Sequence, residues 1–96
     1  MTVASITFAA VGGNIPAIRI DDAVTEVVTP SGSNQVTTAA TTADRVIIRI
    51  AADVALYVSV GTAPNATSDP GRFLLPAGAV EYVAAGSEKK AAVILA

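Results

Sequence analysis

The chain has 96 residues and a formal net charge of −2, with no cysteine and no histidine; it has the length of one domain and lacks disulfides, thiolate chemistry and the commonest general base and transition-metal ligand. Apolar residues make up 52% of it, charged residues 15% and aromatic residues 4%, which predicts a core of many small side chains and a surface only partly adapted to water. The six basic residues are dispersed along a net acidic chain, so nucleic-acid binding through a basic patch is not expected.

The segment 1–11 is apolar, and we expect it to contain a strand rather than a signal peptide. No basic residue precedes its apolar stretch, as one would in a signal peptide. Serine and threonine recur at alternate positions, which places Ile6 and Phe8 on one face of a strand over residues 5–10. No apolar run in the chain reaches the roughly 18–20 residues that span a bilayer, so no membrane partner is expected.

Further extended segments follow before the middle of the chain. Residues 17–20 and 24–29 are rich in β-branched side chains and are predicted as two short strands. Residues 30–34 read Pro-Ser-Gly-Ser-Asn and end the second of them in a turn. Residues 35–42 are rich in threonine and fit either a strand or an extended loop. Helix propensity alone favours a helix over the alanine-rich residues 39–44, but that stretch lacks a helical period and is the weaker interpretation.

The clearest alternation lies in the middle of the chain. Apolar residues occupy every second position in two consecutive runs, namely Val46, Ile48 and Ile50 in the first and Val54, Leu56, Val58 and Val60 in the second. The short break at residues 51–53 separates the runs, so residues 45–60 are predicted to form an antiparallel hairpin.

Three shorter strands are predicted in the remainder, over residues 73–75, 80–84 and 89–95. The segment 61–71 contains prolines, glycines, Asn and Asp without a period, and it is interpreted as a connecting loop. Seven or eight short strands with frequent turn signals are typical of a β-sandwich. We therefore expect residues 1–96 to form a single all-β domain, a small β-sandwich or jelly-roll-like fold of seven to eight short antiparallel strands.

Several predicted strands are apolar on both faces. Ile47, Val83 and Ile94 are out of phase with the residues expected to face the core, and Tyr57 lies on the outer side of its strand. An exposed strand face in a monomer is normally polar. One interpretation is that single apolar residues are exposed, as is common; the other is that these residues contact another subunit or partner.

The sequence offers no recognisable catalytic or cofactor site. No serine lies in a nucleophile-elbow motif, and no nucleotide-binding glycine motif is present. The cluster Asp21, Asp22 and Glu26 does not match a calcium-binding loop, and it is interpreted as a solvated turn. Arg45 and Arg49 are interpreted as solvated edge charges rather than phosphate ligands. We expect no enzymatic activity, no metal and no cofactor.

From Val46 onward, the chain resembles small structural proteins of tailed-bacteriophage virions, of the capsid decoration or cement type. The pattern is a Tyr-Val-x-Val-Gly strand at 57–61, a loop with proline and Ala-Thr, a Leu-Pro-Ala-Gly turn at 75–78, and Glu-Tyr at 81–82. It is carried by residues 48–50, 55–67, 73–78, 80–82 and 90–95. The resemblance spans about half of the chain, and the rest contributes only compatible β patterning.

The resemblance implies a virion protein, made in the host cytoplasm and bound on the capsid surface. Its expected partners are the major capsid protein and copies of itself, with a homotrimer favoured. Aromatic residues are enriched at interface hot spots, so the expected contact residues are Tyr57, Phe73 and Tyr82, with Ile47 and Ile94. Two alternatives remain open: a tail, neck or fibre-associated structural protein, and a carbohydrate-binding attachment module.

Overall fold

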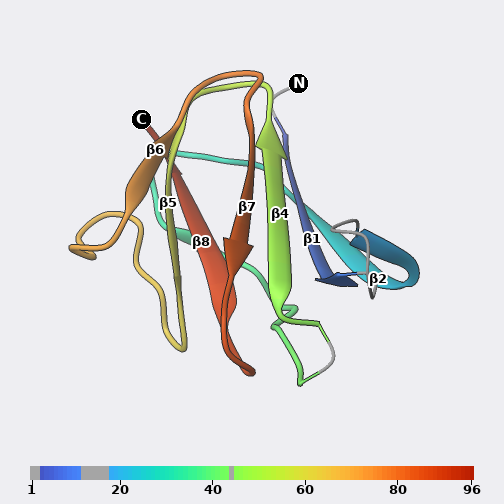
Figure 1. The fold of residues 1–96 in the computed structure, drawn as a ribbon. Helices are drawn as coiled ribbons and strands as arrows, with labels where there is room; N and C mark the ends of the chain where they lie inside the picture. The colour runs from blue at the N-terminus through green and yellow to red at the C-terminus, as the bar shows by residue number, and fades with distance from the viewer. Residues whose placement is uncertain (1–2, 12–17, 44) are drawn as a thin grey trace.

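The computed structural model describes residues 3–11, 18–43 and 45–96, and within these ranges the chain forms eight strands and no helix (Figure 1). The strands are β1 (Ala4–Val11), β2 (Ile18–Val28), β3 (Gln35–Val36), β4 (Ile47–Ala52), β5 (Leu56–Gly61), β6 (Phe73–Leu75), β7 (Val80–Ala84) and β8 (Lys90–Leu95). All their pairings are antiparallel. The predicted all-β class is confirmed.

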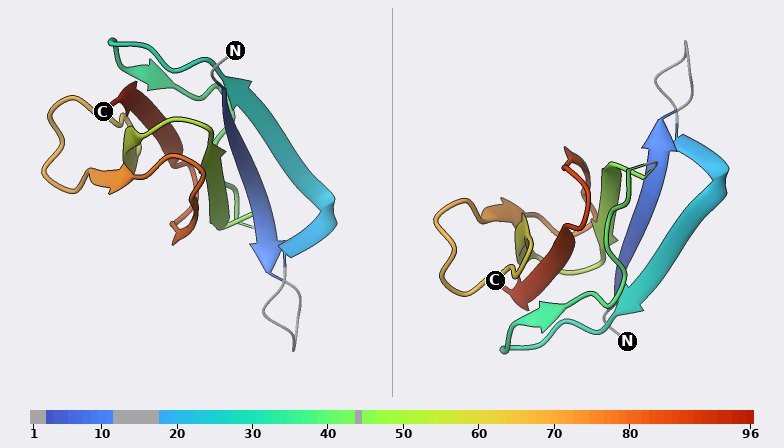
Figure 2. Two further views of the ribbon diagram at one scale, coloured as in Figure 1. Left: turned by 90° about the horizontal axis from the view of Figure 1, so that it is seen from above. Right: turned by 90° about the horizontal axis from the view of Figure 1, so that it is seen from below.

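The strands form two four-stranded sheets that pack face to face (Figure 2). We call the sheet with the order β2-β1-β4-β7 the first sheet and the sheet with the order β3-β8-β5-β6 the second sheet. Counted from β2, this is the strand order of a jelly roll in which β1 takes the position of the last strand. Consistent with that order, the start of β1 and the end of β8 lie at the same end of the sandwich (Figure 1).

The predicted hairpin over residues 45–60 is wrong. β4 pairs with β1 and β7 in the first sheet, while β5 pairs with β8 and β6 in the second. Residues 53–55 therefore cross from one sheet to the other. Ile50 and Leu56 are both completely buried, but they reach the core from opposite sheets. Alternation specifies that each strand has one buried face and does not specify which strand lies beside it.

The two predicted strands at 17–20 and 24–29 are one strand, β2. Its pairing with β1 is interrupted: Phe8 pairs with Val24 and Ala10 pairs with Arg19, so two steps along β1 match five along β2. The extra residues form a bulge, which bends the strand (Figure 2). Asp21 and Asp22, expected in a turn, lie within this strand, and their side chains are outside the described part of the structure.

The core lies between the sheets and is built from small and branched side chains. Its largest completely buried members are Phe8, Ile6, Ile48, Ile50 and Leu56. The predicted inward faces of 5–10, 45–50 and 54–60 are confirmed by these residues together with Val58. In β8, Ala91 and Val93 are completely buried, whereas Leu95 on the same side of the strand is 38% exposed. Val83 was expected to face outward, but it pairs with Ile48 and packs against the core. Strand β7 therefore has the opposite orientation to the one expected: Val83 faces inward, and its neighbours Tyr82 and Ala84 face outward.

The segment between β3 and β4 is held by threonine and glutamate side chains rather than by a sheet ladder. Thr37 and Thr41 are 1% and 2% exposed, and their hydroxyl groups accept hydrogen bonds from the N–H groups of Ala91 and Lys89. The Glu26 carboxylate accepts the N–H groups of Thr38 and Ala39. Of the predicted strand or extended loop over 35–42, only β3 is a strand.

The β7–β8 turn contains a residue in an unfavourable conformation. Glu88 has φ of 60° and is the one non-glycine residue with a positive φ in the described part of the chain. Glycine adopts this conformation without a Cβ clash. Glu88→Gly is therefore expected to stabilise the domain by about 0.5–1 kcal/mol, measured as a rise in the thermal midpoint. The matched variant Ser87→Gly should lower the midpoint, and equal effects of both variants would contradict the argument.

Candidate protein-binding site

The structure separates the five predicted contact residues instead of bringing them together. Tyr57 and Ile94 are paired on the outer face of the second sheet. Ile47 and Tyr82 lie on the outer face of the first sheet, beside Ala9 and Arg49 respectively. Phe73 pairs with Val58 on the inner side and packs against the core. The candidate binding site is thus one of two outer faces, at opposite sides of the sandwich.

The outer face of the second sheet is partly covered by the chain's own loop over residues 62–71. This loop lies on the side of the second sheet that is turned away from the first sheet (Figures 1 and 2). Ser59 and Ala92 are outward-facing neighbours in this sheet, yet they are 3% and 0% exposed. Ala66 from the loop is itself completely buried. The segment predicted as a simple connector is a packed cover.

Three side chains fasten this loop to the sheet. Asp69 accepts hydrogen bonds from the Ser59 hydroxyl at 2.6 Å and from the Asn65 N–H at 2.7 Å. Asn34 donates to the Pro64 carbonyl and accepts the Ala66 N–H.

The third fastening side chain is Arg72, which closes the end of the loop. It donates to the carbonyl groups of Ala66 and Thr67, and its guanidinium lies 4.6 Å from the centre of the Tyr57 ring. The cation and the aromatic ring of this face are therefore already engaged within the chain.

The Asn65 N–H and, next, the Ser59 hydroxyl lower the pKa of Asp69 below its ordinary value of 3.8, because both donate to the charged form. A lowered folded-state pKa stabilises the fold above the unfolded pKa, and this contribution is lost as the pH falls through the folded value. Asp69→Asn should therefore lower the thermal midpoint near neutral pH. The difference from the parent chain should vanish in strong acid, as followed by circular dichroism across a pH series. A difference that persists in acid would contradict the ionic role.

The uncovered part of the second sheet's outer face is an apolar row. Leu74, Tyr57 and Ile94 are cross-strand neighbours on β6, β5 and β8. Leu74 is 53% exposed, and Val36 on β3 is 43% exposed. This row is short because the loop covers the adjacent one.

The outer face of the first sheet is exposed chiefly along its two edge strands, β2 and β7, whereas Thr7 and Ala9 on the central strand β1 are 8% and 0% exposed. Paired residues form two rows across β2, β1, β4 and β7: Val27, Ser5, Ala51 and Val80 in one, and Thr25, Thr7, Arg49 and Tyr82 in the next. Val27, Tyr82 and Val80 are 64%, 55% and 43% exposed. Between Val27 and Val80 lie only the small side chains of Ser5 and Ala51, so the middle of that row has no large projection.

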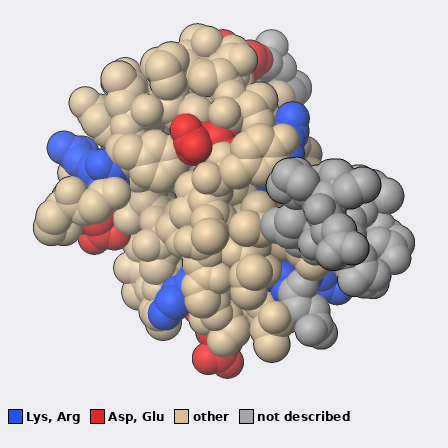
Figure 3. Space-filling view, in the orientation of Figure 1, with Lys and Arg blue, Asp and Glu red and all other residues tan. Residues whose placement is uncertain are grey.

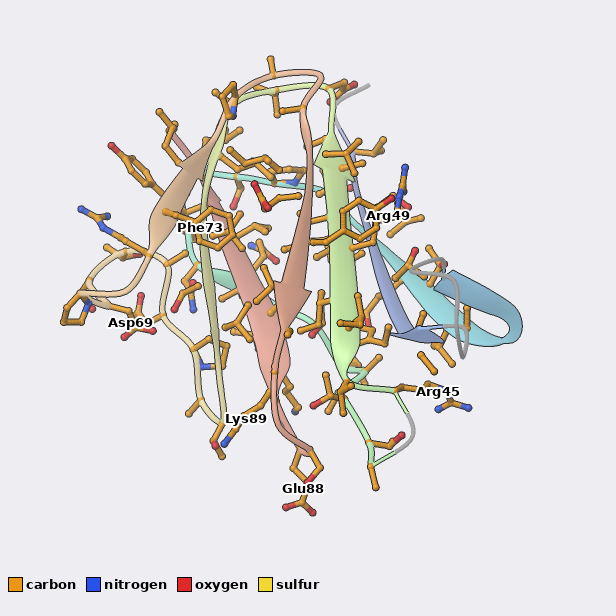
Figure 4. The ribbon with its side chains drawn as sticks, in the orientation of Figure 1. Arg45, Arg49, Asp69, Phe73, Glu88 and Lys89 are labelled. Atoms are coloured by element: carbon orange, nitrogen blue, oxygen red, sulfur yellow. The ribbon has the colours of Figure 1, made fainter. Side chains whose placement is uncertain are left out.

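Arg49 is the one charged side chain in these two rows. It lies between Thr7 and Tyr82 and is half-buried. The Thr7 hydroxyl shares a hydrogen bond of 2.8 Å with the Thr25 hydroxyl, and it forms none with Arg49. In Figure 4 the Arg49 side chain lies on the side of β4 away from β5 and β8. The expected edge position of Arg49 is wrong, because β4 is a central strand.

A groove opens where the two sheets part between β6 and β7. Its volume is about 380 Å³, and its lining includes Val60, Phe73, Val83 and Lys89. Figure 4 shows Phe73 on the side of β5 that faces this groove. The Glu81 carboxylate accepts the N–H of Tyr82, so a charged group occupies part of the free edge of β7. Charged residues at such edges oppose pairing with further strands.

The remaining surface carries few charges. On the side seen in Figure 3, acidic and basic side chains are few and separated by uncharged surface. No group of acidic residues suited to holding a metal ion occurs among the residues described, 3–11, 18–43 and 45–96. Over the same ranges, no helix is long and apolar enough to cross a membrane. The side chain of Glu26, from the predicted acidic cluster, is engaged with the backbone of residues 38–39.

Of the residues on this candidate face, the sequence analysis named Tyr82 and Ile47 as contacts, set Arg49 aside, and did not name Val27 or Val80. Val27 and Val80 were predicted inside ordinary strands, and nothing in the local pattern marks the residues that end up beside them. The signal that unites this face is the register across four strands, which is a property of the fold. No family model, no curated protein and no solved structure matches the chain.

Proposed function

We propose that the chain is a structural, non-enzymatic virion protein that decorates a bacteriophage capsid and stabilises it by binding the outer surface of the major capsid protein shell. The observation that carries the proposal is the outer face of the first sheet, on which Val27 at one edge and Val80 and Tyr82 at the other edge are exposed. Exposed apolar patches of this kind mark protein-binding surfaces. A rigid two-sheet domain presents such a face with little loss of conformational entropy on binding.

The resemblance to capsid decoration proteins supplies the partner, and the structure gives its pattern a physical reason. The Tyr-Val-x-Val-Gly stretch is β5, and the Ala-Thr loop is the cover on the second sheet. The Leu-Pro-Ala-Gly stretch ends β6 and turns at Gly78, whose φ is 77°. Every part of the pattern serves strand pairing, loop packing or a turn. Viral capsid domains use jelly rolls, which supports the proposal at the level of fold analogy.

The test is the number of copies of the chain in each purified virion of the bacteriophage that encodes it. Quantitative mass spectrometry would compare the chain with the major capsid protein. Hundreds of copies per particle are expected for a capsid-decorating protein. About a dozen copies would assign the chain to the neck or tail instead, and absence from the particle would overturn the proposal.

We also propose that the chain associates with itself as a trimer. The exposed Leu74 and Val36, with Ile94, give the second sheet a separate apolar patch for that contact. Light scattering across a concentration series measures the mass in solution. A stable trimer would support the proposal, whereas a monomer at every concentration would overturn it.

A further inference from the structure

The two outer faces of the sandwich differ in how their arginines are used. On the second sheet, Arg72 donates to two loop carbonyls and lies against Tyr57. On the first sheet, Arg49 has no hydrogen bond, ion pair or ring contact with any described residue. The chain's own loop covers part of one face, and the other face presents an arginine that no described residue engages.

Among the residues whose side chains the structure describes, no acidic group lies beside Arg49 on this face. The outward positions nearest to it are Thr7 on β1, Tyr82 on β7, and Ile47 and Ala51 along β4. The glutamates of the sheet's described side chains, Glu26 and Glu81, pair in register with the inward-facing Ile6 and Ile50. They therefore lie on the opposite side of the sheet. In its described positions, the face carries one positive charge, that of Arg49, and no negative charge.

From this arrangement we infer that the outer face of the first sheet docks against a different protein chain that presents a carboxylate opposite Arg49. Covering the face removes water from a half-buried guanidinium, which is costly unless an anionic acceptor replaces the water. A carboxylate does so with two parallel hydrogen bonds. Tyr82 beside it adds the second residue type that dominates interface hot spots. The inference rests on the proposed function, in which the partner chain is the capsid shell.

A second copy of the chain is a poorer occupant of this face. A two-fold pairing brings the same patch from both copies together. In their described positions, two such faces offer Arg49 no carboxylate, and they bring two guanidinium groups into one interface, which is unfavourable. Charge complementarity therefore favours an acidic patch on another protein.

The test measures incorporation of charge-reversal variants into virions. R49E should reduce the copies per particle by about tenfold or more, because it places a carboxylate against the partner's carboxylate. The matched control is K90E, which makes the same charge change on the outer face of the second sheet, where Lys90 is paired with Gly61. K90E should incorporate like the parent chain. Thermal unfolding of R49E should match that of the parent, since Arg49 has no intramolecular partner among the described residues.

A cross-linking experiment identifies the partner. R49K places a primary amine at this position, and a zero-length carbodiimide joins an amine to a carboxylate with which it is in contact, releasing water overall. In purified virions, mass spectrometry should find this cross-link to an Asp or Glu of the major capsid protein. A cross-link to a second copy of the chain would overturn the inference and assign the face to self-association.

The two proposals fail in different ways. Equal incorporation of R49E, K90E and the parent chain would overturn the docking face and leave the virion role standing. Absence of the parent chain from virions would overturn the virion role, and the docking inference would fall with it because the acidic partner named here is the capsid shell.

Discussion

Phe8→Ala should lower the free energy of unfolding by about 3–5 kcal/mol, the usual loss for a fully buried phenylalanine. Phe8 is the largest side chain that is completely buried, and it contacts a core of residues too short to fill the space it leaves. It is paired in register with Ile48 on β4 and Val24 on β2. A small domain has a total stability of only about 5–15 kcal/mol. If the parent chain lies near the lower end of that range, Phe8→Ala is expected to be partly unfolded at 37 °C.

Urea unfolding followed by circular dichroism measures the change as a shift in the midpoint. Phe73→Ala is the matched control, because it removes the same atoms from a half-buried position beside the groove. We expect it to cost about 1–2 kcal/mol, in proportion to the smaller buried area. An equal loss in the free energy of unfolding for the two variants would contradict the greater burial of Phe8 on β1.

The position of Phe8 in the core is among the features that the sequence predicts well. Alternation over residues 5–10 places Ile6 and Phe8 on one face, and both are completely buried. The same rule succeeds for Ile48 with Ile50. A residue's side of its own strand is decided locally, because successive side chains point to opposite faces.

The neighbour of each strand is decided by contacts distant in sequence, and there local patterns fail. The hairpin at 45–60 and the outward phase of Val83 were wrong for this reason. A run such as Val80–Ala84 has apolar residues in both phases, so either phase satisfies the alternation rule. Only the pairing of Val83 with Ile48 settles which is inward.

The candidate docking face was predicted in part for the same reason. Tyr82 is identified by residue type alone, since tyrosine is common at hot spots. The free state of Arg49 depends on which residues lie beside it on β1 and β7 and on the opposite orientation of Glu26 and Glu81. The loop over 62–71 shows the converse: its prolines and glycines predict a loop, and only the fold shows that it engages Arg72.

Thr41→Val should destabilise the domain by about 2–3 kcal/mol, although it replaces a hydroxyl with a methyl group of similar size. The Thr41 hydroxyl donates to the Gly86 carbonyl and accepts the Lys89 N–H, both in the β7–β8 turn. Its backbone N–H and carbonyl are bonded to Lys89 and Glu88. Valine leaves two backbone groups without partners beside a residue that is 2% exposed, and each unsatisfied buried group costs about 1–3 kcal/mol.

Two companion variants separate hydrogen bonding from packing. Thr41→Ser keeps the hydroxyl and removes the methyl group, so it should retain more stability than Thr41→Val. Thr38→Val makes the same change from threonine to valine at an exposed position in the same segment. It should change the free energy of unfolding by no more than about 0.5 kcal/mol. Hydrogen exchange at the Lys89 amide gives a local readout and should accelerate in Thr41→Val alone. An unchanged exchange rate at Lys89 would mean that water already hydrogen-bonds the polar groups of the β7–β8 turn. Thr41 would then hold the segment between β3 and β4 in place by packing rather than through its hydroxyl.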